Sequence, residues 1–505
     1  MRLTCREILA VVLSSGLPAL CGLTYQKRSS QTVLNGLPDD DSAPLPMANP
    51  TRSFWTDSSP DANPLAREGS EGPLTTDADV CIIGSGMTGV SAAYHFASAV
   101  KTDASLRPLK AVVFEARDFC SGATGANGGH LAPHKFFEFR RNVKAFGYYD
   151  AIKGVDIEEH VASEIARILK TEGLEDKVDF VDGGRINLLF TQEEEDEARE
   201  DYEAAKIAGV DLSSVQWLSK EDVQKTYGAP YPAVRIPAAN IWPLKFVTAL
   251  YELARNATPA FSLHLHTRTP VTSIHRLAHD GGRRARQWAL QTPRGRVSCA
   301  YVLHATNAYA SHLLPQLAGP VGIVPARGQI IAVRANATAA QLTDSGFTGN
   351  EMLEYWFARP TRTPDERPLV ILGGGREVSE KPYEMYEADD GELNPDVGRA
   401  LRDFLPGVFP GYFEKGREPE MEWSGIMGFT LLGDPFVGPV LKDFSDLSGS
   451  SYSGQYIAAG YSGHGMPRAF GCADVVSRMI LARIQGTEWE QPDWLPVHYI
   501  TSFWP

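Results

Sequence analysis

The sequence predicts an α/β fold of more than one domain, and three observations support this prediction. A short apolar run at 79–83 is followed by a glycine-rich turn, an alanine-rich helical segment and a second apolar run at 111–115. This alternation is typical of parallel strands covered by helices. The 505 residues exceed the usual length of one domain. Residues 320–435 are rich in strand signals and aromatic side chains, which favour a second sheet.

The composition is that of a globular protein. Hydrophobic residues make up 43% and charged residues 22%, which argues against disorder as the main theme. The net charge of −14 repels phosphate backbones, so we expect no nucleic-acid partner. The six cysteines are too few and too scattered for a disulfide scaffold, and no CxxC pair occurs, so we expect no metal site.

The first 24 residues combine basic side chains with a short apolar run. Arg2 and Arg6 precede the apolar residues 8–23, a run that is short for a membrane span and typical of a secretory signal. An apolar extension of a cytoplasmic protein is the alternative, and both locations stay open. Asn256 and Asn336 begin Asn-Ala-Thr triplets, which are glycosylation acceptors only in a secreted chain. Residues 25–76 are predicted to form an irregular lead-in because Ser, Pro, Asp and Gly dominate there.

The clearest motif is a GxGxxG turn between the strand 79–83 and a helix at 90–100. Gly84 permits the tight turn, Gly86 lets the backbone approach a pyrophosphate, and Gly89 lets helix and strand pack closely. The helix N-terminus attracts the phosphates. The second strand ends in Glu115, which can accept hydrogen bonds from ribose hydroxyls. These features predict a Rossmann-type dinucleotide site, although the motif alone does not separate NAD from FAD.

Two further glycine-rich segments lie at 116–131, where four glycines fall within nine residues, and at 456–466, which contains Gly-Tyr-Ser-Gly-His-Gly. With the first motif, they resemble the D-amino-acid oxidase/sarcosine oxidase superfamily of FAD-dependent oxidoreductases. The pattern is most similar to the glutamylputrescine-oxidase-like branch of bacteria and fungi. The resemblance covers about residues 47–485 and includes 241–245, 302–307 and 325–329.

The resemblance implies FAD as the cofactor and two domains that alternate along the chain. The FAD-binding domain would comprise residues 77–150, 241–320 and 436–485, the substrate domain residues 151–240 and 321–435, and a tail residues 486–505. The substrate domain would be α+β with a mixed or antiparallel sheet. The expected cofactor-binding residues are Gly84, Ser85, Gly86, Met87, Thr88, Gly89, Glu115, Ala116, Cys120, Ser121, Gly122, Ala123, Thr124, Asn127, Gly128, Gly129, Thr306, Asn307, Gly460, Ser462, Gly463, His464, Gly465 and Met466.

Catalytic and substrate-binding residues are less sharply indicated. His464, within the last glycine turn, is either a catalytic residue or a hydrogen-bonded structural one. Met427 stands where a related enzyme attaches its flavin through cysteine, so we expect non-covalent FAD. Pro467 stands where the same relative has a lysine, so a carboxylate-binding lysine is absent, and Arg376 or Arg468 could replace it. The residues expected to line the substrate cavity are Tyr355, Phe357, Arg376 and Phe429.

The resemblance implies oxidation of the C–N bond of an amine or amino-acid-like small molecule, by hydride transfer to FAD and with O2 as a possible acceptor. One alternative is a tailoring oxidase of secondary metabolism that acts on a C–C or C–O bond, since a fold does not fix a reaction. Another is a flavin-binding protein without catalysis. The sequence does not indicate an oligomeric state.

Overall fold

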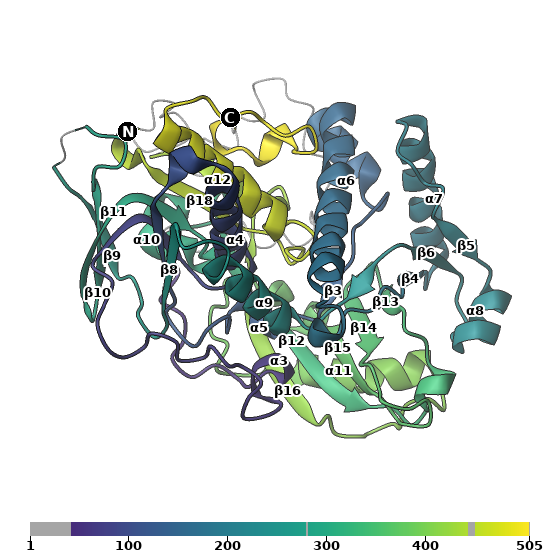
Figure 1. Cartoon of the computed structure of the whole chain (residues 1–505). Helices are drawn as coiled ribbons and strands as arrows, with labels where there is room; N and C mark the ends of the chain where they lie inside the picture. Colours follow the sequence, from purple (N-terminus) through teal and green to yellow (C-terminus); the bar gives the residue numbers. More distant parts are fainter. Residues whose placement is uncertain (1–41, 279–280, 443–449, 504–505) are drawn as a thin grey trace.

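Two eight-stranded sheets form the framework of the protein (Figure 1). The computed structural model describes residues 42–278, 281–442 and 450–503. The predicted signal at residues 1–24 and the first part of the lead-in lie outside the described residues. No helix in the described ranges has the length and apolar character needed to cross a bilayer.

The first sheet has a core of five parallel strands, because each central strand is a short apolar run buried on both faces. An antiparallel strand continues it at one edge, and an antiparallel hairpin joins β11. In spatial order the strands are β17 (Phe436–Pro439), β18 (Gln455–Ala459), β11 (Gly295–His304), β1 (Asp77–Ile83), β2 (Leu109–Phe114) and β8 (Phe261–His266), with β10 (Trp288–Thr292) and β9 (Ser273–Arg276) off this path.

Three helices cover one face of this sheet: α4 (Met87–Thr102), α9 (Pro243–Arg255) and α12 (Ala469–Gln485). Val80 and Ile82 of β1 point to this side, where they join the main hydrophobic core. The alternate residues of β1 face the β9–β10 hairpin in a separate core. The Rossmann-type arrangement that the sequence predicts is therefore confirmed, with α4 directly after the glycine turn.

The second sheet is antiparallel except for the parallel pair β13–β4, as the expected mixed or antiparallel sheet requires. Helix α11 (Pro395–Val408) covers it, and Val397, Leu401 and Leu405 pack on apolar side chains of β12 and β15. In spatial order its strands are β16 (Met421–Phe429), β12 (Val324–Arg334), β15 (Leu369–Gly374), β14 (Glu354–Ala358), β13 (Gly346–Gly349), β4 (Arg185–Leu188), β6 (Ala233–Ile236) and β5 (Gln216–Leu218).

Helix α6 (Phe139–Glu172) lies between α12, which covers the first sheet, and α7 (Gln192–Ile207) (Figure 1). The sequence predicts a helix over residues 156–171, whereas α6 begins at Phe139 and is kinked at Gly147, which has a φ of 82°. The short remaining elements are α3 (Phe54–Asp57), α5 (Ala123–Ala126), α8 (Lys220–Tyr227), α10 (Ala310–Leu313) and the strand pair β3 (His130–Leu131) and β7 (Ala239–Asn240).

A disulfide joins Cys81 of β1 to Cys299 of β11, two adjacent strands whose Cα atoms at these positions are 6.0 Å apart. The sequence did not predict this disulfide, since spacing in the chain does not indicate which strands pair. Cys120 and Cys472 are buried free thiols.

Candidate active site

A cavity of about 940 Å³ runs from the glycine turn after β1 to the face of the second sheet. Residues around both sheets form its walls. They come from the ends of β1 and β2, the segment 122–134, strands β12, β14 and β16, and the turn before α12. All of the predicted cofactor-binding residues line this cavity except Ser85, Gly89, Cys120, Ser121 and Gly460.

The glycine turn has the geometry that its sequence predicts. Gly84 has a φ of 111°, and a Cβ there would lie 2.5 Å from the carbonyl oxygen of Ala305. A Cβ on Gly89 would lie 2.0 Å from the carbonyl oxygen of Gly84, so this residue packs helix against turn and stays out of the cavity. Gly86 is the N-cap of α4 and has no side chain to cap the first turn. The positive end of the helix is therefore open to an anion.

Glu115 directly follows β2 beside this turn and lines the cavity. Its Oε2 accepts hydrogen bonds from the backbone N–H of Ser85 (3.0 Å) and from the Ser85 hydroxyl (2.7 Å), and its Oε1 accepts from the N–H of Arg117 (2.9 Å). The Ser85 Oγ also accepts from the N–H of Cys120 (2.8 Å). Ser85 thus links the turn after β1 to Glu115 and to Cys120, and neither Ser85 nor Cys120 lines the cavity.

Two glycines of the segment 122–129 are required because neighbouring atoms leave no space for a Cβ. A Cβ on Gly128 would lie 2.2 Å from the ring of Tyr355. Gly129 has a φ of 76°, and a Cβ on it would lie 2.8 Å from the carbonyl oxygen of Ile241. The Thr124 hydroxyl accepts from the N–H of Met87 (3.0 Å) and so ties this segment to the start of α4.

The turn after β18 closes the opposite wall. Gly460 donates its N–H to Asn307 Oδ1 (3.0 Å), and Ser462 donates its N–H to Gly428 O (2.7 Å). The turn then leads to α12, whose first residue is Ala469. Gly460 itself packs on Thr430 and Ile323 and stays behind the cavity wall.

His464 lies in this turn with its ring stacked on that of His134, at a centroid distance of 3.8 Å. Its Nε2 is 3.2 Å from Oε1 of Glu158. Burial lowers the pKa of His464, against the opposing effect of Glu158, so the imidazole is neutral at pH 7. The sequence patterns did not indicate His134 or Glu158 as site residues. The available signal was an acidic residue beside the apolar stripe of the predicted helix 156–171.

Glu158 is 2% exposed and has further partners. Its Oε1 accepts from Nε of Arg468 (2.8 Å), and its Oε2 accepts from the N–H of His134 (2.6 Å). Burial would raise the pKa of Glu158, but attraction to His464, Arg468 and His134 outweighs burial and holds this pKa well below its usual value. The carboxylate is therefore ionised in the core.

Arg468 also donates to Oδ1 of Asp434 (2.9 Å). Oδ2 of Asp434 is 3.0 Å from Nε2 of His498, whose Nδ1 contacts Asp150. Burial would raise the pKa of Asp434, but Arg468 and His498 lower it overall. The expectation that Arg468 binds a substrate anion does not fit this arrangement, because two acids of the protein already share its guanidinium.

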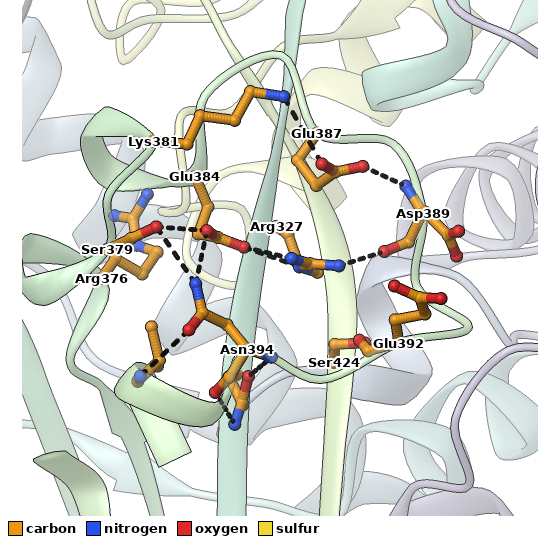
Figure 2. Close-up of polar contacts among 12 residues, drawn as sticks. Arg327, Arg376, Ser379, Lys381, Glu384, Glu387, Asp389, Glu392, Asn394 and Ser424 are labelled. Atoms are coloured by element: carbon orange, nitrogen blue, oxygen red, sulfur yellow. Dashed lines mark hydrogen bonds and ion pairs between the residues drawn. The ribbon is translucent and has the colours of Figure 1, made fainter. Parts of the chain in front are cut away.

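The loop at 376–394 forms another part of the wall and is held by buried charges (Figure 2). Arg327 of β12 donates from Nε to Oε2 of Glu384 (2.7 Å). Oε1 of the same carboxylate accepts from Asn394 Nδ2 (2.8 Å) and from the Ser379 hydroxyl. These bonds outweigh the effect of burial and lower the pKa of Glu384. The loop residues held in the wall in this way are Arg376, Tyr383 and Met385.

Of the residues expected to contact a substrate, Tyr355, Arg376 and Phe429 line the cavity. The guanidinium of Arg376 lies over the Phe429 ring, 5.1 Å from its centroid. Phe357 does not line the cavity: it is 1% exposed and packs on Trp55 and His130 in the core. Strand alternation places Phe357 on the same face of β14 as Tyr355, but one step farther along, where these rings cover it.

Met427 of β16 lines the cavity next to Gly463, where a Cβ would lie 3.5 Å from its sulfur. A methionine thioether has no thiol with which to attach a flavin. The expectation of non-covalent FAD stays a prediction, and the position of Met427 in the cavity wall is compatible with it.

The fold and the cavity define a class: a dinucleotide-binding protein in which the turn after β1 would hold the phosphates and the cavity beside the second sheet would take the reactive ring. The model of the family described as FAD dependent oxidoreductase (DAO) matches residues 79–479. The chain belongs to this family and is an FAD-dependent oxidoreductase. The predicted cofactor and enzyme class are confirmed.

Relatives of known activity are distant. The chain is 24% identical to glycine oxidase of Bacillus licheniformis over 433 residues, covering 81% of this chain and 95% of the relative. It is 25% identical to gamma-glutamylputrescine oxidoreductase of Escherichia coli over 434 residues, covering 81% and 84%. Among solved structures, glycine oxidase from Geobacillus kaustophilus matches with a TM-score of 0.60 at 19% identity, covering 84% of this chain and 99% of that one.

The residues present fit FAD. The open helix end at Gly86 suits a diphosphate, the Glu115 carboxylate retains lone pairs for ribose hydroxyls, and the cavity continues from these residues to the second sheet. The hydroxyls of Thr306 and Tyr309, which also line the cavity, are buried and have no hydrogen-bond partner within the described residues. Such atoms are typical of a wall that faces a polar ligand.

Proposed function

We propose that the protein oxidises the C–N bond of a small amine or amino-acid-like substrate, with O2 as the acceptor that regenerates the cofactor. The observation that carries this proposal is the continuous cavity that joins the dinucleotide turn to a wall of aromatic and basic side chains around His464. The names of the relatives, glycine oxidase and gamma-glutamylputrescine oxidoreductase, point to the same chemistry in those proteins.

When bound, FAD supplies the acceptor for the hydride that leaves the carbon next to nitrogen. The contribution of the chain is to orient the substrate and to manage its protons. An amine gives up hydride readily only as the free base, because the nitrogen lone pair must assist. Glu158 favours the tautomer of His464 that carries its proton on Nε2, which leaves Nδ1 as an acceptor. Nδ1 of the neutral imidazole is therefore suited to take the proton of an ammonium group.

The positive N-terminus of α12 lies just beyond this turn and favours negative charge in the cavity. Two aromatic side chains, Tyr355 and Phe429, line the same cavity. The chain thus combines a proton acceptor with a positively polarised cavity, which suits amine oxidation.

The test is an anaerobic titration of the purified yellow protein with a panel of amines and amino acids. Loss of the visible flavin absorbance, followed by its return with formation of hydrogen peroxide when air is admitted, supports the proposal. Release of ammonia or an aldehyde identifies the C–N bond as the site of oxidation. A desaturated or ring-modified product without ammonia indicates the C–C or C–O alternative. No bleaching by any compound of a broad panel indicates a flavin-binding protein without turnover.

A further inference from the structure

Arg185, the first residue of β4, is a buried cation that lines the cavity. It is 4% exposed. Its Nη1 donates to the backbone carbonyl of Ala132 (3.4 Å). Its Nε and Nη2 are buried and have no hydrogen-bond partner among the described residues. Donors of this kind are rare in a folded protein, and each one calls for a specific explanation.

No acidic side chain in the described part of the chain forms an ion pair with Arg185. The acid that influences it is Glu158, and both oxygens of Glu158 are occupied, by Nε of Arg468 and by the N–H of His134. The histidines around Arg185 do not offset its charge either. His130, His134 and His464 all have pKa values lowered, first by burial, and are neutral at pH 7.

The guanidinium is charged nevertheless. Burial lowers the pKa of Arg185 to about 10, which is still far above neutral pH. A buried positive charge without a hydrogen-bonded partner is costly to the protein, and such residues persist where a ligand completes them.

The other arginines of the cavity differ from Arg185 in this respect. Arg376 lies on the Phe429 ring and donates to the carbonyl of Tyr383. The remaining four each pair with acids of the protein: Arg117 with Asp390, Arg140 with Asp201, Arg141 with Glu138, and Arg468 with Glu158 and Asp434.

The two donors of Arg185 without a partner also have the geometry that a carboxylate requires. Nε and Nη2 lie on one edge of the planar guanidinium, and their N–H bonds are parallel. This edge matches the two oxygens of a carboxylate, whereas Nη1 on the opposite side is already used by Ala132.

We infer that Arg185 binds a carboxylate of the substrate, so that the amine which the enzyme oxidises carries an anionic carboxyl group. This inference rests on the proposed oxidation of an amine and narrows it to amino acids and related amino-carboxylates. Arg185 takes the place of the lysine that Pro467 replaces, from strand β4 instead of the turn before α12.

The test separates binding from turnover. Benzoate, a carboxylate that the enzyme cannot oxidise at a C–N bond, is titrated into the holoenzyme, and the flavin absorbance reports binding; benzamide is the neutral control. We expect benzoate but not benzamide to bind measurably, and Arg185→Met to weaken benzoate on the order of 10- to 100-fold, as the loss of a charged hydrogen bond predicts. Arg185→Lys keeps the charge but not the paired donors and should fall between. Arg376→Met is the matched cavity arginine and should change benzoate binding much less.

The inference is overturned if Arg185→Met binds benzoate as the wild type does, or if Arg376→Met causes the larger loss. It is also overturned if both Arg185 variants lack FAD, which would assign the guanidinium to the cofactor, or if phosphate perturbs the flavin in an Arg185-dependent way while benzoate does not. Arg185-dependent benzoate binding in a protein that no amine reduces would leave the anion site standing and refute only the proposed amine oxidation.

Discussion

Replacing Gly86 with valine tests whether the glycine turn exists for a phosphate or for the fold. The backbone of Gly86 has a φ of −74°, which any residue can adopt, and a Cβ there would meet only the Thr124 hydroxyl, at 3.0 Å. The substitution should therefore leave the apoprotein folded. The new side chain would occupy the part of the cavity that Gly86 lines, at the open end of α4. Gly84 and Gly89 cannot serve, because a Cβ there would clash with backbone and would disturb the fold itself.

The expected loss follows from the bonds that a phosphate would forfeit. Two hydrogen bonds from a helix terminus to an anion contribute about 1.5–3 kcal/mol each, so FAD affinity should fall roughly 10²- to 10⁴-fold. The wild type should gain about 2.7 kcal/mol of unfolding free energy when FAD is present at 100 times its Kd, and Gly86→Val should gain almost none. Flavin absorbance of the purified protein and thermal melts with and without FAD measure both effects.

Gly407 provides the matched control, since it is exposed on α11 and a Cβ there would meet nothing within 4 Å. Gly407→Val should load FAD as the wild type does. Normal yellow holoprotein from Gly86→Val would refute the phosphate role of this turn, and an unfolded apoprotein would show that the glycine serves the fold.

Three other predictions concern the reactive end of the cavity. Acid precipitation should release free FAD into the supernatant, because Met427 cannot attach a flavin; colour in the pellet would contradict this. His464→Ala should keep its FAD but turn over about 10²- to 10⁴-fold more slowly, as loss of a proton acceptor predicts, and unchanged turnover would make the residue purely structural. Glu158→Gln should lower the pKa of His464 and move the acidic limb of kcat/KM to lower pH, since the carboxylate raises that pKa. It should also cost about 3 kcal/mol of unfolding free energy at pH 7. The pKa of Glu158 is lowered by folding, so this difference should shrink as the pH falls below 4.5; a pH-independent difference in denaturant melts would argue against an ionised Glu158.

The parts of the site that local sequence patterns encode could be predicted. The glycine turn after β1 and the turn around His464 each lie between a strand and a helix within about a dozen residues, and Glu115 directly follows a strand. The structure has all three where the patterns indicate. Arg185 could not be found in this way. It begins β4, but whether an alternating side chain points into a cavity or into solvent depends on which sheet the strand joins and on its register.

The charge chain behind His464 was beyond local patterns for the same reason. Glu158 comes from α6, Asp434 from the segment after β16, and His498 from the segment that the sequence describes only as a tail. That tail is part of the core, since Leu495, Tyr499 and Ile500 are each 1% exposed.

The tail also bears on the chemistry. His498 and the hydroxyl of Tyr499 hold Asp434, and Asp434 shares Arg468 with Glu158. Arg468 thus contacts both acids, and its charge is one of the effects that keep the pKa of Glu158 low. The imidazole can then stay neutral in a buried site and still have its tautomer selected by the neighbouring carboxylate. A proton acceptor of this kind needs an acid that is charged and an arginine that restrains it, and in this protein the C-terminal residues hold both in place.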